Sequence, residues 1–122
     1  EKAKTLHLPI EDVMGDMKIL DIGEQTIKKF IKIIRKSKTV IWNGPVGLSE
    51  LKPFQKGTFS VAKALAWSRK TVRSIIGGGD TVEAIKRMGF KENQFSFVST
   101  GGAAMVEFLE GRKLPGIEIL TL

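Results

Sequence analysis

The stretch Ser74–Ile85 constrains the fold of this chain most strongly, because it reads as a strand, a glycine turn and a helix. Its apolar first part is typical of a buried strand, and the glycines Gly77–Gly79 lack the side chains that restrict a sharp turn. Apolar residues then recur at helical spacing up to Gly89, which predicts the end of the helix. Asp80 or Thr81 lies where the helix should begin. One interpretation is therefore an ordinary βα turn with Asp80 as the N-cap.

The same turn has a second, functional interpretation as a phosphate site. The first N–H groups of a helix have no partner within the helix, and the helix dipole adds positive charge there, so an anion binds favourably. Asp80 adds a carboxylate oxygen beside that position, and magnesium prefers such oxygens as ligands. On this stretch alone both interpretations stand, because glycine-rich turns are common.

Two further predicted strands end in unusual turns. Residues Thr39–Trp42 are β-branched or aromatic, which predicts a buried strand that Asn43-Gly44-Pro45 breaks. Residues Phe95–Val98 predict another strand, which runs into Ser99–Gly102 and then into a helix. The carboxyl ends of parallel strands lie along one edge of a sheet, where open α/β sheets bind ligands. Three such turns at one edge favour a ligand crevice over ordinary loops.

The remaining segments alternate with these strands, which predicts an α/β fold. We expect an amphipathic helix over residues 24–37 and another helix that Thr58 caps. Residues 5–10 predict an edge strand that a proline limits, and residues 11–20 a solvated connection rather than an acidic metal cluster. Residues 117–120 predict a final strand or a docked tail. The predicted architecture is a Rossmann-like parallel sheet with helices on both faces, a three-layer αβα partial domain.

The composition excludes several functions. The 122 residues include no cysteine and a single histidine, His7, which excludes disulfides, thiol chemistry and a multi-histidine metal site. No apolar run is long enough to span a membrane, so no membrane partner is expected. The formal charge of +7 favours phosphate-bearing ligands. The basic residues are spread over helix surfaces without interleaved aromatic residues, so we expect no nucleic-acid partner.

Taken together, these motifs resemble the phosphoglycerate kinase family, specifically the C-terminal half of its nucleotide-binding domain. The matching runs, in the order of the family, are Asp21-Ile22-Gly23 with Thr26, Trp42–Gly47 with Glu50, Gly57-Thr58, Gly77–Thr81, Ser99–Gly102, and Glu107–Gly111 with Leu114-Pro115-Gly116. The resemblance covers roughly residues 20–122, and a series of this length is far more specific than any single motif.

The resemblance implies transfer of a phosphoryl group from 1,3-bisphosphoglycerate to Mg-ADP, which yields 3-phosphoglycerate and ATP in cytoplasmic glycolysis by a monomeric full-length enzyme. It implies Mg²⁺ and ADP or ATP as cofactors, with Asp80 as the metal ligand and Glu50 as the acceptor for the ribose hydroxyls. The nucleotide-binding residues implied in this way are Asn43, Gly44, Pro45, Val46, Glu50, Gly77, Gly78, Gly79, Asp80 and Thr81. The resemblance also places the backbone N–H groups of Gly101 and Gly102 near the transferred phosphoryl group, as a reaction that needs positioning and charge neutralisation requires.

The chain also departs from the family pattern. The substrate domain and the first half of the nucleotide domain have no counterpart here, so we expect residues 1–122 to be a fragment that is inactive alone. Ala103 replaces a usual third glycine, Ser49 replaces an aromatic residue, and the 11–20 connection is short. Three hypotheses follow: part of an active kinase, a nucleotide-binding half-domain without catalysis, and an interaction module.

Overall fold

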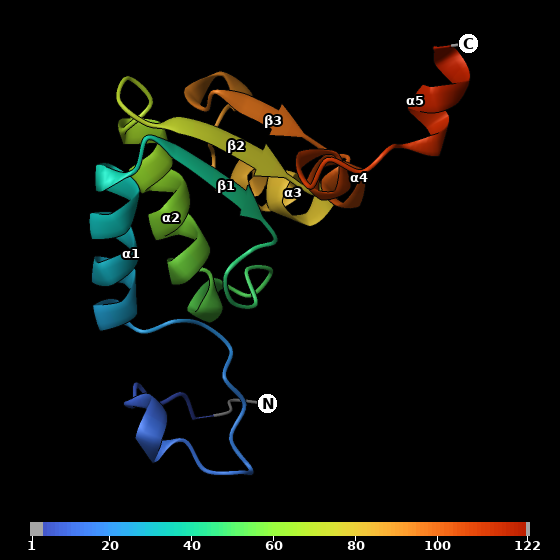
Figure 1. Cartoon of the computed structure of the whole chain (residues 1–122). Coiled ribbons are helices and arrows are strands. Elements are labelled where there is room, and N and C mark those ends of the chain that lie inside the picture. Colours follow the sequence, from blue (N-terminus) through green and yellow to red (C-terminus); the bar gives the residue numbers. More distant parts are fainter. Residues whose placement is uncertain (1–3, 122) are drawn as a thin grey trace.

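A parallel three-stranded sheet forms the centre of the computed structural model, which describes residues 4–121 (Figure 1). Its neighbouring strands, in spatial order, are β1 (Thr39–Asn43), β2 (Arg73–Gly77) and β3 (Phe97–Ser99). Asn43 pairs with Gly77, which pairs with Ser99, so the three strands end level with one another. The predicted α/β fold with a parallel sheet is thus confirmed.

Helices α1 (Glu24–Lys36), α2 (Lys56–Trp67) and α3 (Gly79–Arg87) pack on one face of the sheet. Alternate strand residues face these helices, since Trp42 and Ile76 are buried there and Val40 and Val98 are partly buried against the same core, as the two-residue period of a strand requires. The sheet and these helices share one hydrophobic core, which consists of Ile34, Trp42, Val61, Ala62, Ala64, Leu65, Val72, Ile76, Ile85 and Phe95.

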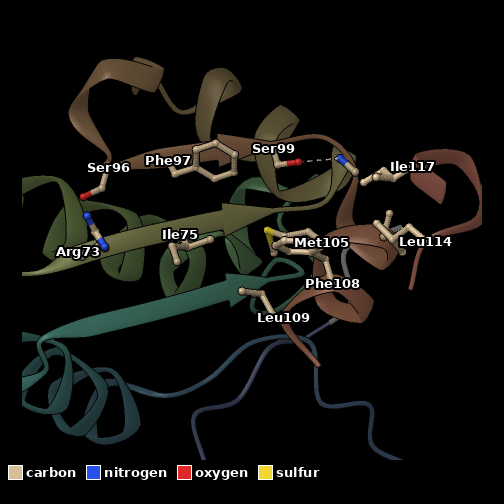
Figure 2. A pocket seen from close by; sticks show the side chains of 12 residues that line it. Arg73, Ile75, Ser96, Phe97, Ser99, Met105, Phe108, Leu109, Leu114 and Ile117 are labelled. Carbon is tan, nitrogen blue, oxygen red and sulfur yellow. Dashed lines mark hydrogen bonds between the residues drawn. The ribbon is translucent and has the colours of Figure 1, made fainter. Parts of the chain in front are cut away.

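The opposite face of the sheet is only partly covered. Ile41 is 52% exposed and Phe97 57% exposed, although both belong to strands. Helix α4 (Gly102–Leu109) covers the carboxyl end of this face, where the Met105 side chain lies directly against Gly77. Helices therefore lie on both faces, as predicted. An apolar groove of about 610 Å³ remains between α4 and the open face. Figure 2 shows the side chains that line it.

Two predicted strands near the ends of the chain are wrong. Residues 5–10 form no strand; Pro9 precedes a single 3₁₀ turn, Ile10–Asp12, and this segment lies apart from the sheet in Figure 1. Residues 117–120 belong instead to helix α5 (Pro115–Leu120), which begins at a proline, a residue that suits the first helical position. This helix is not docked, since it projects away from the sheet and contains no buried residue. None of the described helices is both long and apolar enough to cross a membrane.

Several predicted element boundaries also shift. Helix α2 begins at Lys56, so Thr58 lies inside its first turn instead of capping it. Strand β3 begins only at Phe97, because Phe95 closes the 3₁₀ turn Glu92–Gln94; its side chain packs in the core against Phe90, with 6.1 Å between ring centroids. Gly89 follows the end of α3 with a φ of 87°, which confirms its predicted role after the helix.

Candidate functional site

The three predicted turns meet at the carboxyl edge of the sheet. The turn after β1 begins at Asn43, the turn after β2 at Gly77 and the turn after β3 at Ser99, and these residues are paired in register. A hydrogen bond of 3.0 Å from the N–H of Gly78 to the carbonyl oxygen of Ser99 continues the contact beyond the strands. The sequence prediction that these segments share one edge is therefore confirmed in geometry.

The turn after β2 depends on a glycine at position 78. Gly78 has a φ of 93°, a backbone conformation that side chains disfavour, and an added Cβ would lie 2.6 Å from Oδ1 of Asn43. Gly78 is also the N-cap of α3, so the alternative prediction that Asp80 caps this helix is wrong. Within residues 4–121, the N–H groups of Gly79, Asp80 and Thr81 have no backbone acceptor, as expected for a first helical turn.

Asp80 is exposed in this first turn and makes no salt bridge within residues 4–121. Its carboxylate is therefore accessible to a cation. No group of three or more acidic or histidine side chains in the described chain is arranged to hold a metal ion by itself. A magnesium ion fits such a position when waters and ligand phosphates complete its coordination, because this ion commonly uses only one or two carboxylates.

The turn after β1 is tied to α3 through Thr81. The N–H of Gly44 donates to Oγ1 of Thr81 at 2.8 Å, and the indole Nε1 of Trp42 donates to the carbonyl oxygen of Gly44 at 2.7 Å. Thr81 is completely buried, so its hydroxyl holds the turn in place. The sequence did not indicate that the hydroxyl of Thr81 has a partner in the protein.

The turn after β3 leads into α4 and brings two backbones into close contact. A Cβ added to Gly102 would lie 2.7 Å from Cα of Gly78, so only glycine fits there. The N–H of Gly101 donates to Oγ of Ser99 at 3.2 Å, and the N–H of Gly102 donates to the carbonyl oxygen of Thr100 at 3.0 Å. Both N–H groups thus have local acceptors.

The N-termini of α3 and α4 consequently lie at the same edge of the sheet. The N–H groups of Ala103 and Ala104, like those at the start of α3, have no backbone acceptor within the described residues. Ala103 is exposed, so its methyl group is not buried against the rest of the protein. Two helix N-termini that lie side by side form a positive region suited to an anion.

The remaining site candidates lie in the segment after Gly44. Pro45 and Val46 are half-buried, and Glu50 is exposed. Ser49 is buried, and its hydroxyl lies 3.5 Å from a guanidinium nitrogen of Arg87, which occupies the space beside this small residue. The structure brings Asn43 and Gly44 next to the glycine turns, whereas Val46 bonds to Thr58 of α2.

Two residues at this segment were not recognised as site residues from the sequence. Thr58 bonds to the backbone of Val46. Asp21 lies against Gly47 and bonds to Gly57 in the first turn of α2. The available signal was the pair Gly47 and Gly57, since small residues at two such positions indicate that another group approaches closely.

One ionisable group near the start of α1 has a shifted pKa. The hydrogen bond from Nζ of Lys56 to Glu24, 2.6 Å long, lowers the pKa of that exposed carboxyl, and the lysine charge adds to the effect. The pair joins the first turns of α1 and α2. Because both side chains are more than half exposed, this ion pair contributes little to the stability of the fold.

Comparisons with known proteins agree with this geometry. The family model for phosphoglycerate kinase matches residues 1–112. The phosphoglycerate kinase of Herpetosiphon aurantiacus is 50% identical over 120 residues, which cover 98% of this chain and 30% of that protein. The structure of phosphoglycerate kinase from Coxiella burnetii superposes with a TM-score of 0.80 at 43% identity, over 92% of this chain and 28% of that one. The enzyme from Pyrococcus horikoshii gives a TM-score of 0.75 at 36% identity, over 85% and 25% of the two chains. The chain thus spans about 30% of the length of the curated relatives that it matches.

Proposed function

Since the chain belongs to the phosphoglycerate kinase family, we propose that it supplies part of the nucleotide site of an enzyme that moves a phosphoryl group between 1,3-bisphosphoglycerate and Mg-ADP. In this proposal residues 1–122 are the C-terminal part of a nucleotide-binding domain that serves glycolysis in the cytoplasm. The open sheet face and the outer edge of β1 support a partial domain, because further strands and helices can add there.

One observation carries the proposal: the N-termini of α3 and α4 lie together at the edge where three strands end. Phosphates bind to N–H groups of this kind without any side-chain charge, and the formal charge of +7 attracts them further. A merely structural βα turn would not require the Gly78 and Gly102 backbones to pack in direct contact. The arrangement therefore favours a phosphate crevice.

The proposed roles divide the edge into two parts. Asn43, Gly44, Pro45, Val46 and Glu50 lie at the nucleoside, with Glu50 exposed to accept hydrogen bonds from ribose hydroxyls. The Gly77–Gly79 turn and the start of α3 lie at the phosphates. Asp80 holds the magnesium ion, which when bound neutralises charge on the phosphate oxygens. Thr81 joins the two parts, because its hydroxyl accepts a hydrogen bond from the N–H of Gly44.

The start of α4 is the proposed position of the transferred group. Gly101 and Gly102 allow backbone to approach the phosphoryl oxygens, and the helix dipole stabilises negative charge there. In this proposal their N–H groups exchange the local acceptors Ser99 and Thr100 for the phosphoryl oxygens. 3-Phosphoglycerate is then bound by a part of the enzyme outside this chain.

A chimaeric enzyme tests the proposal. The matching segment of the Herpetosiphon aurantiacus enzyme is replaced by this chain, and ATP formation from 1,3-bisphosphoglycerate and Mg-ADP is measured, with Asp80→Asn as the matched variant. We expect activity in the chimaera and a large loss in the variant. Nucleotide binding without ATP formation would instead favour the alternative, a half-domain that binds nucleotide without catalysis. A folded chimaera with neither property would overturn both.

A further inference from the structure

A second buried hydroxyl, that of Thr58, holds the turn after β1 at Val46, whereas Thr81 holds it at Gly44. Oγ1 of Thr58 accepts a hydrogen bond from the N–H of Val46 at 2.9 Å and donates one to the carbonyl oxygen of the same residue. Thr58 is completely buried in the first turn of α2. One side chain thus satisfies both backbone groups of Val46, as a neighbouring strand otherwise would.

The carboxylate of Asp21 packs beside the same turn, against Gly47 and the first turn of α2. Its Oδ2 accepts from the N–H of Gly57 at 2.9 Å, and its Oδ1 accepts from the N–H of Ile22 at 2.8 Å. A Cβ added to Gly47 would lie 2.5 Å from this Oδ1, and one added to Gly57 would collide with it too. The carboxylate therefore fills the space that these two glycines leave.

This contact also supplies a cap that α2 lacks in its own sequence. The N-cap residue Gln55 makes no capping hydrogen bond, whereas Asp21 accepts from the N–H of Gly57 in the first turn. A carboxylate at that end of a helix is favoured by the helix dipole. The N–H of Leu48 also donates to the carbonyl oxygen of Leu20 at 2.7 Å, so the residue before Asp21 is joined to the residue after Gly47.

We propose that Thr58 and Asp21 are positioning residues that fix the Asn43–Gly47 turn for the nucleoside. The inference rests on the proposed function, because the turn is where that function places the adenine and ribose. Neither side chain has to touch the ligand. Thr58 fixes the backbone direction at Val46, and Asp21 fixes the start of α2, which carries Thr58. Ligand affinity should therefore depend on two side chains directed into the protein.

The test compares Thr58→Val, which keeps the shape and removes the hydroxyl, with Thr58→Ser, which keeps the hydroxyl. Thr71→Val is the matched control, since the Thr71 hydroxyl bonds to Ser68 at an exposed site. Mg-ADP affinity is measured by titration at a temperature well below the unfolding transition of each variant. We expect Thr58→Val to bind about tenfold more weakly, because two backbone groups lose their partner, and Thr58→Ser to bind within about twofold of the original chain.

Asp21→Asn is the second variant and serves also where Thr58→Val fails to fold. An amide presents one acceptor oxygen where the carboxylate presents two, so one of the two bonded N–H groups loses its partner. We expect weaker Mg-ADP binding here as well, with faster hydrogen exchange at the amides of Val46 and Gly57. Unchanged affinity and unchanged exchange in the folded variants would overturn the inference.

Amide exchange without nucleotide separates this inference from the proposed function. If the folded chimaera neither binds Mg-ADP nor forms ATP, the proposed function fails. The hydrogen-exchange rates at the amides of Gly44 and Val46, measured without nucleotide, then still test the positioning role of Thr58. Faster exchange at these amides in Thr58→Val, restored in Thr58→Ser and absent from Thr71→Val, supports it. Equal exchange rates in all the variants would contradict it.

Discussion

Replacing Gly102 by alanine tests the packing of the two glycine turns. An added Cβ would lie 2.7 Å from Cα and 3.1 Å from N of Gly78, and 3.0 Å from Oδ1 of Asn43. Two of these three neighbours are backbone atoms, which cannot rotate away. Helix α4 must therefore move, and the β2–α3 turn must move with it.

The matched control is Gly79→Ala. Gly79 is the first residue of α3 as Gly102 is the first residue of α4, and both follow a glycine N-cap. The two positions differ in surroundings, because a Cβ added to Gly79 meets no atom within 4 Å. Helix propensity alone favours alanine over glycine by up to about 1 kcal/mol at either position. Overpacking costs about 1–3 kcal/mol, so after the full propensity gain is subtracted the net loss expected for Gly102→Ala is up to about 2 kcal/mol.

Urea unfolding followed by tryptophan fluorescence measures both free energies, since Trp42 is buried in the core. We expect Gly79→Ala to unfold at the same or a slightly higher urea concentration than the original chain, and Gly102→Ala at a clearly lower one. Equal midpoints for the two variants would refute the reasoning, because they would show that the turns are not in direct contact.

Three further changes have defined outcomes. Asp80→Asn should leave the unfolding midpoint within error and weaken ADP binding in the presence of Mg²⁺ far more than in its absence, as paired titrations would show. Leu65→Ala should cost about 2–5 kcal/mol of unfolding free energy, because Leu65 is completely buried, whereas Leu120→Ala, at an 82% exposed position, should cost less than about 0.5 kcal/mol. The pKa of Glu24 is lowered by Lys56, so the pair stabilises the fold above the ordinary pKa of a carboxyl and the effect disappears as the pH falls through the lowered pKa. Lys56→Gln should remove this small pH dependence, and an equal pH profile in the variant would speak against the pair.

Short runs of apolar or β-branched residues were enough to predict the strands β1 and β2. The apolar run before Gly77 and the β-branched run before Asn43 both became neighbouring parallel strands. Their register follows from burial, since a shift by one residue would expose Trp42 and Ile76. The convergence of the three turns followed from the topology alone.

Long-range contacts explain most of what the sequence did not indicate. Thr58 was expected to cap α2, but its hydroxyl instead bonds to Val46, twelve residues away. The partner of Gly44 is Thr81, thirty-seven residues away, so no window of local sequence contains the pair. Residues 117–120 were expected to form a strand or a docked tail, but a short apolar run also suits a helix, and Pro115 starts one there.

The central claim is that this chain carries an assembled part of a nucleotide site. The most direct measurement is a titration of the isotope-labelled chain with Mg-ADP, followed by amide NMR. The account predicts saturable shifts confined to residues 43–50, 77–81 and 99–102, together with a change at the indole N–H of Trp42, which bonds to Gly44. A folded chain whose amides at all three turns remain unshifted at millimolar Mg-ADP would contradict the claim.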